Sequence, residues 1–198
     1  MNIKYLGTEY GGWTVDVDSI NDGDVVISGG VGEDISFDES LMNEKNVKII
    51  FVDPTEKSHK FMEGRVTGEN ELLKMAITEK SGETIKMFKN KNPEWVSESV
   101  SNTHDMVGEG YHEAETISIT DLVEKYNPTL IKIDIEGSEY DVLKQCIGVK
   151  QICVEFHHHC MTDKTYMDTL KCVNEMNSNG YTVIKDKGNM QEVTFLKK

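Results

Sequence analysis

The chain has 198 residues, and this length predicts one domain, residues 1–198, with a substantial core. Its 35 acidic residues exceed its 21 lysines and arginines, which gives a formal net charge of −14. A chain this acidic is a poor partner for phosphate backbones and anionic lipid surfaces. We therefore expect neither nucleic acid nor a membrane as its partner.

The cysteines and the N-terminus indicate the compartment. The four cysteines form no Cys-x-x-Cys pair, and three of them lie in or beside apolar runs, so we expect reduced, buried thiols. Residues 1–7 lack the apolar core of a signal peptide, and no apolar run is long enough to span a membrane. A cytoplasmic location is the resulting expectation, and the oligomeric state is left open.

Residues 1–23 are expected to form a strand or hairpin extension ahead of the main fold. Within it Trp13, Val15 and Val17 alternate with polar residues, which is typical of a strand. The two glycines before Trp13 would let its ring lie over a bound ligand, so Tyr10 and Trp13 are candidate substrate contacts. A hairpin turn with a core tryptophan is the alternative.

The next segment combines a strand, a glycine turn and a helix. Residues 25–27 (Val-Val-Ile) predict the end of a buried strand, Gly29, Gly30 and Gly32 predict a tight turn, and a helix is expected from Glu33. Such a turn brings backbone N–H groups and a helix N-terminus close to a ligand. A plain strand–helix connection is the alternative.

The residues of this loop favour one cofactor over another. A dinucleotide fingerprint has a third glycine where this chain has Ile35, and Glu33 and Asp34 place negative charge where a pyrophosphate would lie. S-adenosylmethionine (SAM) has no phosphate and carries a positive sulfonium, so acidic surroundings suit it. The loop therefore favours SAM, with candidate contacts at Ser28, Gly29, Gly30, Gly32 and Asp34.

Two further strands predict the adenosine contacts. Residues 47–52 form a buried strand that ends in an Asp-Pro pair, and a carboxylate there can accept hydrogen bonds from both ribose hydroxyls. A solvated turn is the alternative. Residues 72–77 predict a third strand, whose last residues would lie near an adenine. The predicted contacts are Asp53, Pro54, Ala76 and Ile77.

Residues 89–115 are the least regular part of the sequence, and we expect a long loop there after an extra strand at residues 83–88. The loop contains Trp95, Ser97 and Ser99, which offer an aromatic ring and hydroxyls to a polar substrate. A surface loop with a buried tryptophan is the alternative.

The remaining elements alternate between strands and helices, which predicts a mostly parallel sheet with helices on both faces. A closing antiparallel hairpin is a feature of SAM-methyltransferase sheets rather than of dinucleotide dehydrogenases. The predicted elements are a helix with Thr120 as N-cap that ends at Pro128, strands at residues 130–135 and 151–156, a helix from about residue 163 to Gly180, and a hairpin of residues 181–185 and 192–196.

Acidic and imidazole side chains follow the fourth and fifth strands, and in such sheets ligands bind at the carboxyl ends of strands. We expect Asp134 nearest to the methyl group, and Glu136 to fix the loop or the substrate. One of His157 and His158 would act as general base, with Glu155 orienting it or binding a substrate hydroxyl. A polar loop after a strand is the alternative for the histidines.

A divalent metal is a further possibility at this edge. Asp134, Glu155 and His157 supply oxygen and nitrogen ligands that suit Mg²⁺ or a transition metal holding a vicinal diol. The sequence has no repeated metal-ligand spacing, so a metal is not favoured; loss of activity on chelation would support one.

Four segments of the chain resemble, in the same order, FkbM-type SAM-dependent methyltransferases: residues 28–38, 52–55, 131–140 and 154–158. The most specific part is the Lys-x-Asp-Ile-Glu-Gly block, and residues 10–13 and 96–99 resemble one branch of that family. The resemblance implies a Rossmann-like class I SAM-methyltransferase fold and O-methylation, often of a sugar or a secondary metabolite. His159 stands where many relatives carry arginine, so it is a candidate substrate contact.

The expected function is transfer of a methyl group from SAM to a hydroxyl of a sugar in a glycan, with a deoxyhexose such as rhamnose as one candidate acceptor. A nicotinamide-dependent oxidoreductase is the first alternative, which Ile35 and the acidic loop disfavour. The second is a non-catalytic module that binds a carbohydrate or a partner, which the polar strand ends disfavour. Whether the chain belongs to a longer protein with a glycosyltransferase domain is left open.

Overall fold

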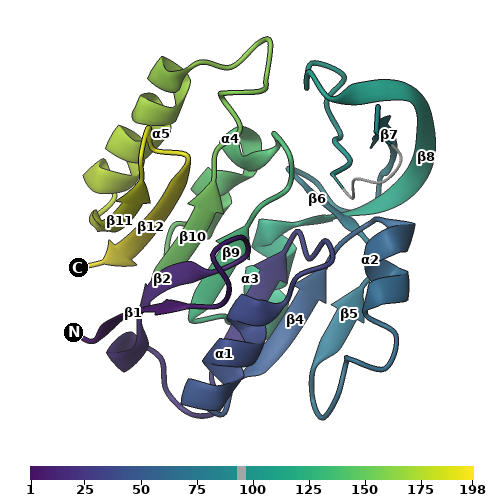
Figure 1. Cartoon of the computed structure of the whole chain (residues 1–198). Coiled ribbons are helices and arrows are strands. Elements are labelled where there is room, and N and C mark those ends of the chain that lie inside the picture. Colours follow the sequence, from purple (N-terminus) through teal and green to yellow (C-terminus); the bar gives the residue numbers. More distant parts are fainter. Residues whose placement is uncertain (93–96) are drawn as a thin grey trace.

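A computed structural model describes residues 1–92 and 97–198, and in this part of the chain seven strands form one sheet in the order β11-β12-β10-β9-β3-β4-β5 (Figure 1). The inner neighbours pair in parallel, whereas β12 is antiparallel to both β10 and β11. This confirms the predicted parallel sheet with a closing antiparallel hairpin. The strands are β3 (Val25–Gly29), β4 (Lys48–Val52), β5 (Glu71–Leu73), β9 (Leu130–Ile133), β10 (Gln151–Glu155), β11 (Tyr181–Lys187) and β12 (Glu192–Lys197).

Side chains alternate between the two faces of this sheet, and each face has its own hydrophobic cluster. In β9, Ile131 and Ile133 join the cluster under α3, α4 and α5, whereas Leu130 joins the cluster under α1 and the β1–β2 hairpin. The hairpin and α1 lie on the near face in Figure 1. These elements are β1 (Ile3–Leu6), β2 (Trp13–Asp16), α1 (Ser36–Glu44), α3 (Ile119–Tyr126), α4 (Glu139–Val142) and α5 (Tyr166–Ser178); η1 (Val17–Ser19), α2 (Glu56–Phe61) and η2 (Leu143–Cys146) complete the helices.

A second, three-stranded sheet in the order β6-β8-β7 corrects two predictions. The expected strand at residues 72–77 is two strands, β5 in the main sheet and β6 (Ala76–Thr78) in the small one. The expected loop at residues 89–115 contains most of β8 (Val107–Ser118), which pairs with β7 (Thr84–Asn90) in a ribbon beside the main sheet (Figure 1). The inward positions of β8 hold small or polar residues, so the sequence has no hydrophobic alternation there.

Two helices begin at other residues than predicted, for local reasons. The first begins at Ser36 rather than at Glu33, because the Asp34 carboxylate accepts a hydrogen bond from the Ser36 N–H at 2.7 Å and residues 30–34 stay outside the helix. In α3 the N-cap is Ser118 rather than Thr120, since the Ser118 hydroxyl accepts from the Asp121 N–H at 3.1 Å. Among the helices of the described residues, none is long and apolar enough to cross a membrane.

Candidate active site

A cleft of about 780 Å³ opens at the carboxyl ends of β3, β4, β9 and β10. This volume is within the range of small-molecule sites, roughly 300–1,000 Å³. Among the described residues that line it, nine are acidic and one is a lysine, so the cleft favours a neutral or cationic ligand. The acidic residues are Glu9, Glu33, Asp34, Asp53, Glu98, Asp134, Glu136, Glu155 and Glu192.

The glycine loop lies directly against the end of β9. Gly30 has a φ of +75°, and a Cβ at this position would lie 1.6 Å from the Asp134 carbonyl oxygen. A Cβ on Gly29 would lie 2.6 Å from Cδ1 of Ile77. No side chain fits at Gly30, so glycine there allows the loop to approach the strand end that carries Asp134.

Asp53 holds this loop in place. It is 4% exposed, and its Oδ2 accepts hydrogen bonds from the backbone N–H groups of Val31 at 2.8 Å and Gly32 at 3.1 Å. Its Oδ1 accepts from the backbone N–H of Thr55 at 2.8 Å and from the Thr55 hydroxyl at 2.6 Å. An ionised carboxylate has about four acceptor sites. Protein donors engage both oxygens, so Asp53 shapes the loop; its contact with the ribose stays a prediction.

The predicted cofactor contacts fall into two groups. Most of them line the cleft, whereas Ser28 is fully buried within β3 and Gly29 packs against β9 and Ile77, so neither lines it. The residues that do line it are Gly30, Gly32, Asp34, Asp53, Pro54, Ala76, Ile77 and Asp134.

Asp134, Glu136, Glu155 and His157 meet in the cleft as predicted. The His157 ring is 5% exposed, and its Nε2 lies 3.3 Å from Oε2 of Glu136 and 3.8 Å from Oδ1 of Asp134. Nζ of Lys132 lies 3.8 Å from the other oxygen of Asp134 and donates a hydrogen bond to the Gly30 carbonyl. Two cations thus flank the Asp134 carboxylate.

The partner that orients His157 is Glu139, which the sequence analysis missed. Glu139 is fully buried, and its Oε1 lies 3.0 Å from Nδ1 of His157. The same carboxylate accepts hydrogen bonds from the backbone N–H groups of Ile135 and Gly137 at 3.0–3.2 Å. A sequence signal existed, because Glu139 lies one turn after Glu136 at the start of α4. Within the described part of the chain, the carboxylate of the predicted orienting residue, Glu155, makes no hydrogen bond or ion pair with His157.

The protonation of His157 argues against the role of base. Burial opposes its charged form, but the carboxylates of Glu139, Glu136 and Asp134 outweigh burial and raise the pKa of His157 well above its usual value. The carboxylates therefore favour the doubly protonated ring, in which neither nitrogen has a lone pair to accept a further proton. The charge of this ring offsets that of the neighbouring carboxylates, and the role of His157 as a general base stays a prediction that these surroundings do not favour.

The other two histidines of the run do not line the cleft among the residues described. Nδ1 of His158 lies 2.9 Å from the hydroxyl of Thr169 in α5, and its ring packs edge-on against Tyr166. His159 is exposed and stacks on His157 with ring centroids 6.0 Å apart. The structure therefore supports neither His158 as a base nor His159 as a contact within the cleft.

The three cleft carboxylates differ in their affinity for protons. Withdrawal from water raises the pKa of Asp134 to about 6, although Lys132 and His157 oppose this, and burial together with Asp134 raises that of Glu155 to about 8. For Glu136, burial is outweighed by hydrogen bonds from His104 and Ser97 and by the charge of His157, so its pKa is lowered. At neutral pH, Glu155 thus holds a proton while Asp134 and Glu136 are ionised.

The N-terminal hairpin places its two candidate residues differently. Tyr10 is 84% exposed and lines the cleft, so its ring is open to a substrate. Trp13 is 4% exposed and belongs to the hydrophobic cluster under α1, although one side of it also borders the cleft. The alternative of a core tryptophan thus describes Trp13 better.

The segment that follows β7 reaches the same site. Ser97 lines the cleft and donates a hydrogen bond to the Glu136 side chain, whereas Ser99 is buried and donates to the Glu136 carbonyl at 2.6 Å. The backbone of Glu136 has a φ of +56°, so Ser99 stabilises a strained turn. Trp95 lies outside the described residues.

The geometry also changes the candidate metal ligands. Asp134, Glu136 and His157 place one ligand atom each within 4.8 Å of one another, so Glu136 takes the place that was predicted for Glu155. A metal at this edge, which the sequence did not favour, stays a prediction.

Some lining residues were not predicted. Glu98 lies 3.0 Å from Nδ1 of His112 in β8, and it occurs in the segment between the two predicted serines. Glu9 and Glu192 lie at the ends of hairpins, and no local pattern indicates that these ends meet at the cleft.

Comparisons with known proteins agree with this architecture. A protein-family model described as "Methyltransferase FkbM domain" matches residues 26–183. No curated protein matches the chain. Among solved structures, the chain is similar to one described as a fibrillarin/Nop5p complex, with a TM-score of 0.51 and 11% identity over 90% of this chain and 74% of that one. At this identity the likeness shows the fold alone.

Two further solved structures are similar at lower scores. One is a precorrin-6y C5,15-methyltransferase from Geobacter metallireducens GS-15, with a TM-score of 0.48 and 14% identity over 92% of this chain and 85% of that one. The other is a magnesium protoporphyrin IX methyltransferase from Synechocystis PCC 6803 with bound SAM, with a TM-score of 0.46 and 10% identity over 91% and 73% of the two chains.

Proposed function

Because the chain belongs to the FkbM methyltransferase family, we propose that it transfers the methyl group of SAM to a hydroxyl of a sugar in a glycan. The chain is a SAM-dependent methyltransferase with a Rossmann-like class I fold, and SAM is its cofactor. The nicotinamide alternative is thereby set aside. What we propose is that the acceptor is a sugar and that the methylated atom is a hydroxyl oxygen.

The residues present fit SAM. The glycine at position 30 lets the loop pack against the strand end that carries Asp134, Asp53 fixes the loop by hydrogen bonds, and both loop and Asp53 line the cleft. The acidic lining suits a donor that carries a sulfonium and an ammonium and no phosphate. Loop residues 30–34 and Asp53 would hold the adenosine end, and Asp134 and Glu136 would face the sulfonium end. When bound, SAM supplies a methyl group that is already activated for in-line displacement.

A sugar hydroxyl is a poor nucleophile, so a base must take its proton as the oxygen–carbon bond forms and the carbon–sulfur bond breaks. Asp134 is suited to this because its pKa of about 6 leaves it ionised at neutral pH and still basic. Lys132 and the charged His157 stabilise the ionised form before transfer. General-base assistance of this kind typically contributes about 10²–10⁴ in rate.

The observation that best supports a sugar acceptor is the set of polar groups around Asp134. Glu155 holds a proton and can donate to a hydroxyl, whereas Glu9 and Glu192 offer acceptor oxygens. The exposed ring of Tyr10 provides a surface on which a pyranose can stack. The same acidic lining disfavours phosphorylated or carboxylated acceptors.

The test is methyl transfer from methyl-labelled SAM to a panel of neutral oligosaccharides that includes deoxyhexoses, acidic oligosaccharides and amines. We expect labelled methyl ethers on the neutral sugars, identified by mass spectrometry, and about 10²–10⁴-fold slower transfer with Asp134→Asn. The matched control is Asp22→Asn, which alters an exposed carboxylate outside the cleft. Transfer only to amines would overturn O-methylation, and no transfer despite SAM binding would favour the non-catalytic alternative.

A further inference from the structure

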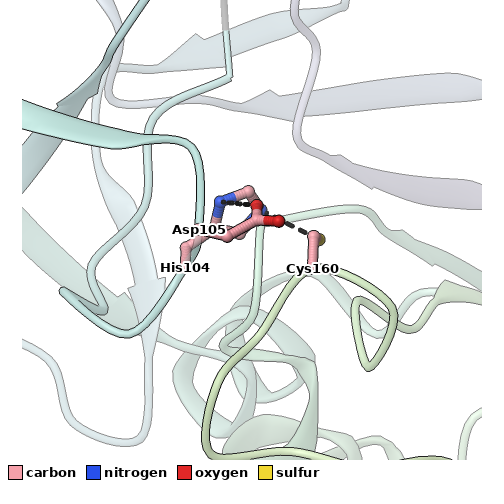
Figure 2. A group of neighbouring side chains, drawn as sticks. All are labelled: His104, Asp105 and Cys160. Atoms are coloured by element: carbon pink, nitrogen blue, oxygen red, sulfur yellow. Dashed lines mark hydrogen bonds and ion pairs between the residues drawn. The ribbon is translucent and has the colours of Figure 1, made fainter.

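Three side chains that can bind metals meet outside the lining of the cleft: His104, Asp105 and Cys160 (Figure 2). Sγ of Cys160 lies 3.1 Å from Nε2 of His104, and Oδ1 of Asp105 lies 3.8 Å from Nδ1 of the same ring. Each residue has one ligand atom within 4.8 Å of those of the other two. Figure 2 shows the three converging from two separate segments.

We propose that His104, Asp105 and Cys160 form a binding site for a divalent transition metal, best matched by Zn²⁺. A sulfur, a nitrogen and an oxygen ligand together suit Zn²⁺, whereas Mg²⁺ and Ca²⁺ take oxygen ligands. Three protein ligands leave the fourth position of a tetrahedral ion to water. The geometry of the two segments, the position of the cysteine and the contact with Glu136 each bear on this proposal.

The two segments are already held together by the backbone. The Asp105 N–H donates to the Cys160 carbonyl at 2.8 Å, and the Thr162 N–H donates to the Thr103 carbonyl at 2.9 Å. An isolated antiparallel bridge joins His104 to Met161 between these bonds. The backbone of both segments is therefore in place before an ion arrives, so binding has little backbone to order.

Cys160 differs from the other cysteines in its surroundings. Cys146 and Cys172 pack in the hydrophobic cluster under α5, and Cys153 packs in the cluster under α1. Among the described residues, Cys160 belongs to neither cluster, and its sulfur contacts the His104 ring and the His157 carbonyl. Packing in an apolar core thus accounts for three of the cysteines but not for Cys160.

Binding has a defined proton balance. The Cys160 thiol releases its proton to solvent as the sulfur binds the ion. If His104 binds through Nε2, which faces the sulfur, its ring proton is on Nδ1. The hydrogen bond that Nδ1 accepts from the Met106 N–H at 3.2 Å is then lost. Oδ1 of Asp105 lies on the Nδ1 side of the ring, 3.8 Å from that nitrogen.

The site would act on the cleft through the contact between His104 and Glu136. Nε2 of His104 also lies 3.3 Å from Oε2 of Glu136, which lines the cleft. An ion on that nitrogen removes a hydrogen-bond donor from Glu136, so the metal site and the methyl-transfer site are linked. The ion would also tie the segment that carries Ser97 to the turn that follows β10.

The test is titration of the metal-free chain with Co²⁺, followed by displacement with Zn²⁺. A thiolate ligand gives cobalt a sulfur-to-metal charge-transfer band, which a site made only of carboxylates and imidazole lacks. We expect one equivalent of Co²⁺ to produce this band in the wild type, and Zn²⁺ to abolish it. In His104→Gln we expect more than about 10-fold weaker binding.

The matched pair of variants is Cys160→Ser and Cys172→Ser, since both residues are partly buried and only the first lies in the cluster. The band should be lost in Cys160→Ser and kept in Cys172→Ser, with circular dichroism showing that both variants are folded. Absence of the band in the wild type, or its persistence in folded Cys160→Ser, would overturn the proposal. The readout needs no SAM and no acceptor, so it is independent of the proposed methyl transfer.

Discussion

Oε1 of Glu139 lies 3.0 Å from Nδ1 of His157, and both side chains are buried beneath the acidic end of the cleft. This contact fixes the ring so that Nε2 faces Glu136 and Asp134, and it keeps the ring protonated. Together with Lys132, this buried positive charge favours the ionised forms of Asp134 and Glu136. The proposed role of Asp134 as base thus depends on a residue that does not line the cleft.

Replacing Glu139 with glutamine tests this dependence. The variant removes the charge that favours protonated His157, so the pKa of His157 should fall towards its ordinary value, as measured by NMR of the ring protons. Breaking a buried charged pair should also lower the free energy of unfolding by about 3–5 kcal/mol in urea titrations. The ring of His158, which contacts Thr169 instead, is the internal control. An unchanged His157 titration in a folded variant would contradict the assignment.

Asp134→Asn should remove the base. In the wild type we expect the methyl-transfer rate to rise with pH around an apparent pKa near 6, as Asp134 ionises within its coupled cluster. In the variant, kcat should fall by about 10²–10⁴-fold and should no longer rise with pH in this range, while binding of S-adenosylhomocysteine is retained. Steady-state rates across pH, with Asp22→Asn beside them, provide the measurement. If the rate of Asp134→Asn still rises with pH around 6, another group is the base.

Glu155→Gln should change how stability depends on pH. The pKa of Glu155 rises from an ordinary 4.5 to about 8 in the folded chain, so between these values the native state holds a proton that the unfolded state releases. Its contribution to stability is therefore complete below 4.5 and is lost as the pH rises through 8. Urea titrations across this window should show a smaller decline for Glu155→Gln than for the wild type. If the free energies of unfolding of the variant and the wild type fall equally with pH, Glu155 is not protonated in the folded chain.

Gly30→Ala and Gly82→Ala form a matched pair for the loop. Both glycines have nearly the same φ, +75° and +76°, so alanine costs roughly 1–2 kcal/mol of backbone strain at either position. Only at Gly30 would the new Cβ meet another group, the Asp134 carbonyl oxygen at 1.6 Å, since nothing lies within 4 Å at Gly82. We expect calorimetry to show that Gly30→Ala loses affinity for S-adenosylhomocysteine while Gly82→Ala keeps it. Equal affinities of the two variants for S-adenosylhomocysteine would show that the loop can move away from Asp134 without weakening cofactor binding.

The sequence predicted the parallel sheet and its carboxyl-end site because these depend on local patterns. Continuous apolar runs such as residues 49–52 predict burial on both faces of the sheet, and the polar residues that follow them mark the strand ends. Asp134, Glu136, Glu155 and His157 therefore came together as expected. The single-domain boundaries and the glycan acceptor remain predictions.

The sequence could not show features that depend on contacts between distant segments. β8 was missed because its inward Ala114, Thr116 and Ser118 are small or polar and owe their burial to partners in β6 and β7. The sequence did not show that Glu139, eighteen positions away, lies beside His157 and favours its protonated ring, because the two meet only after α4 forms. The sequence offered no means to choose between His157 and His158 as the base, because their different surroundings arise only in the fold.

The most direct test of the account is a crystal structure of the chain with S-adenosylhomocysteine. The adenosine should lie beside residues 30–34 and Asp53, and the sulfur should face the cluster of Asp134, Glu136 and His157. If the ligand instead occupies another surface, or lies in the cleft with its sulfur turned away from Asp134, the proposed site of methyl transfer is wrong.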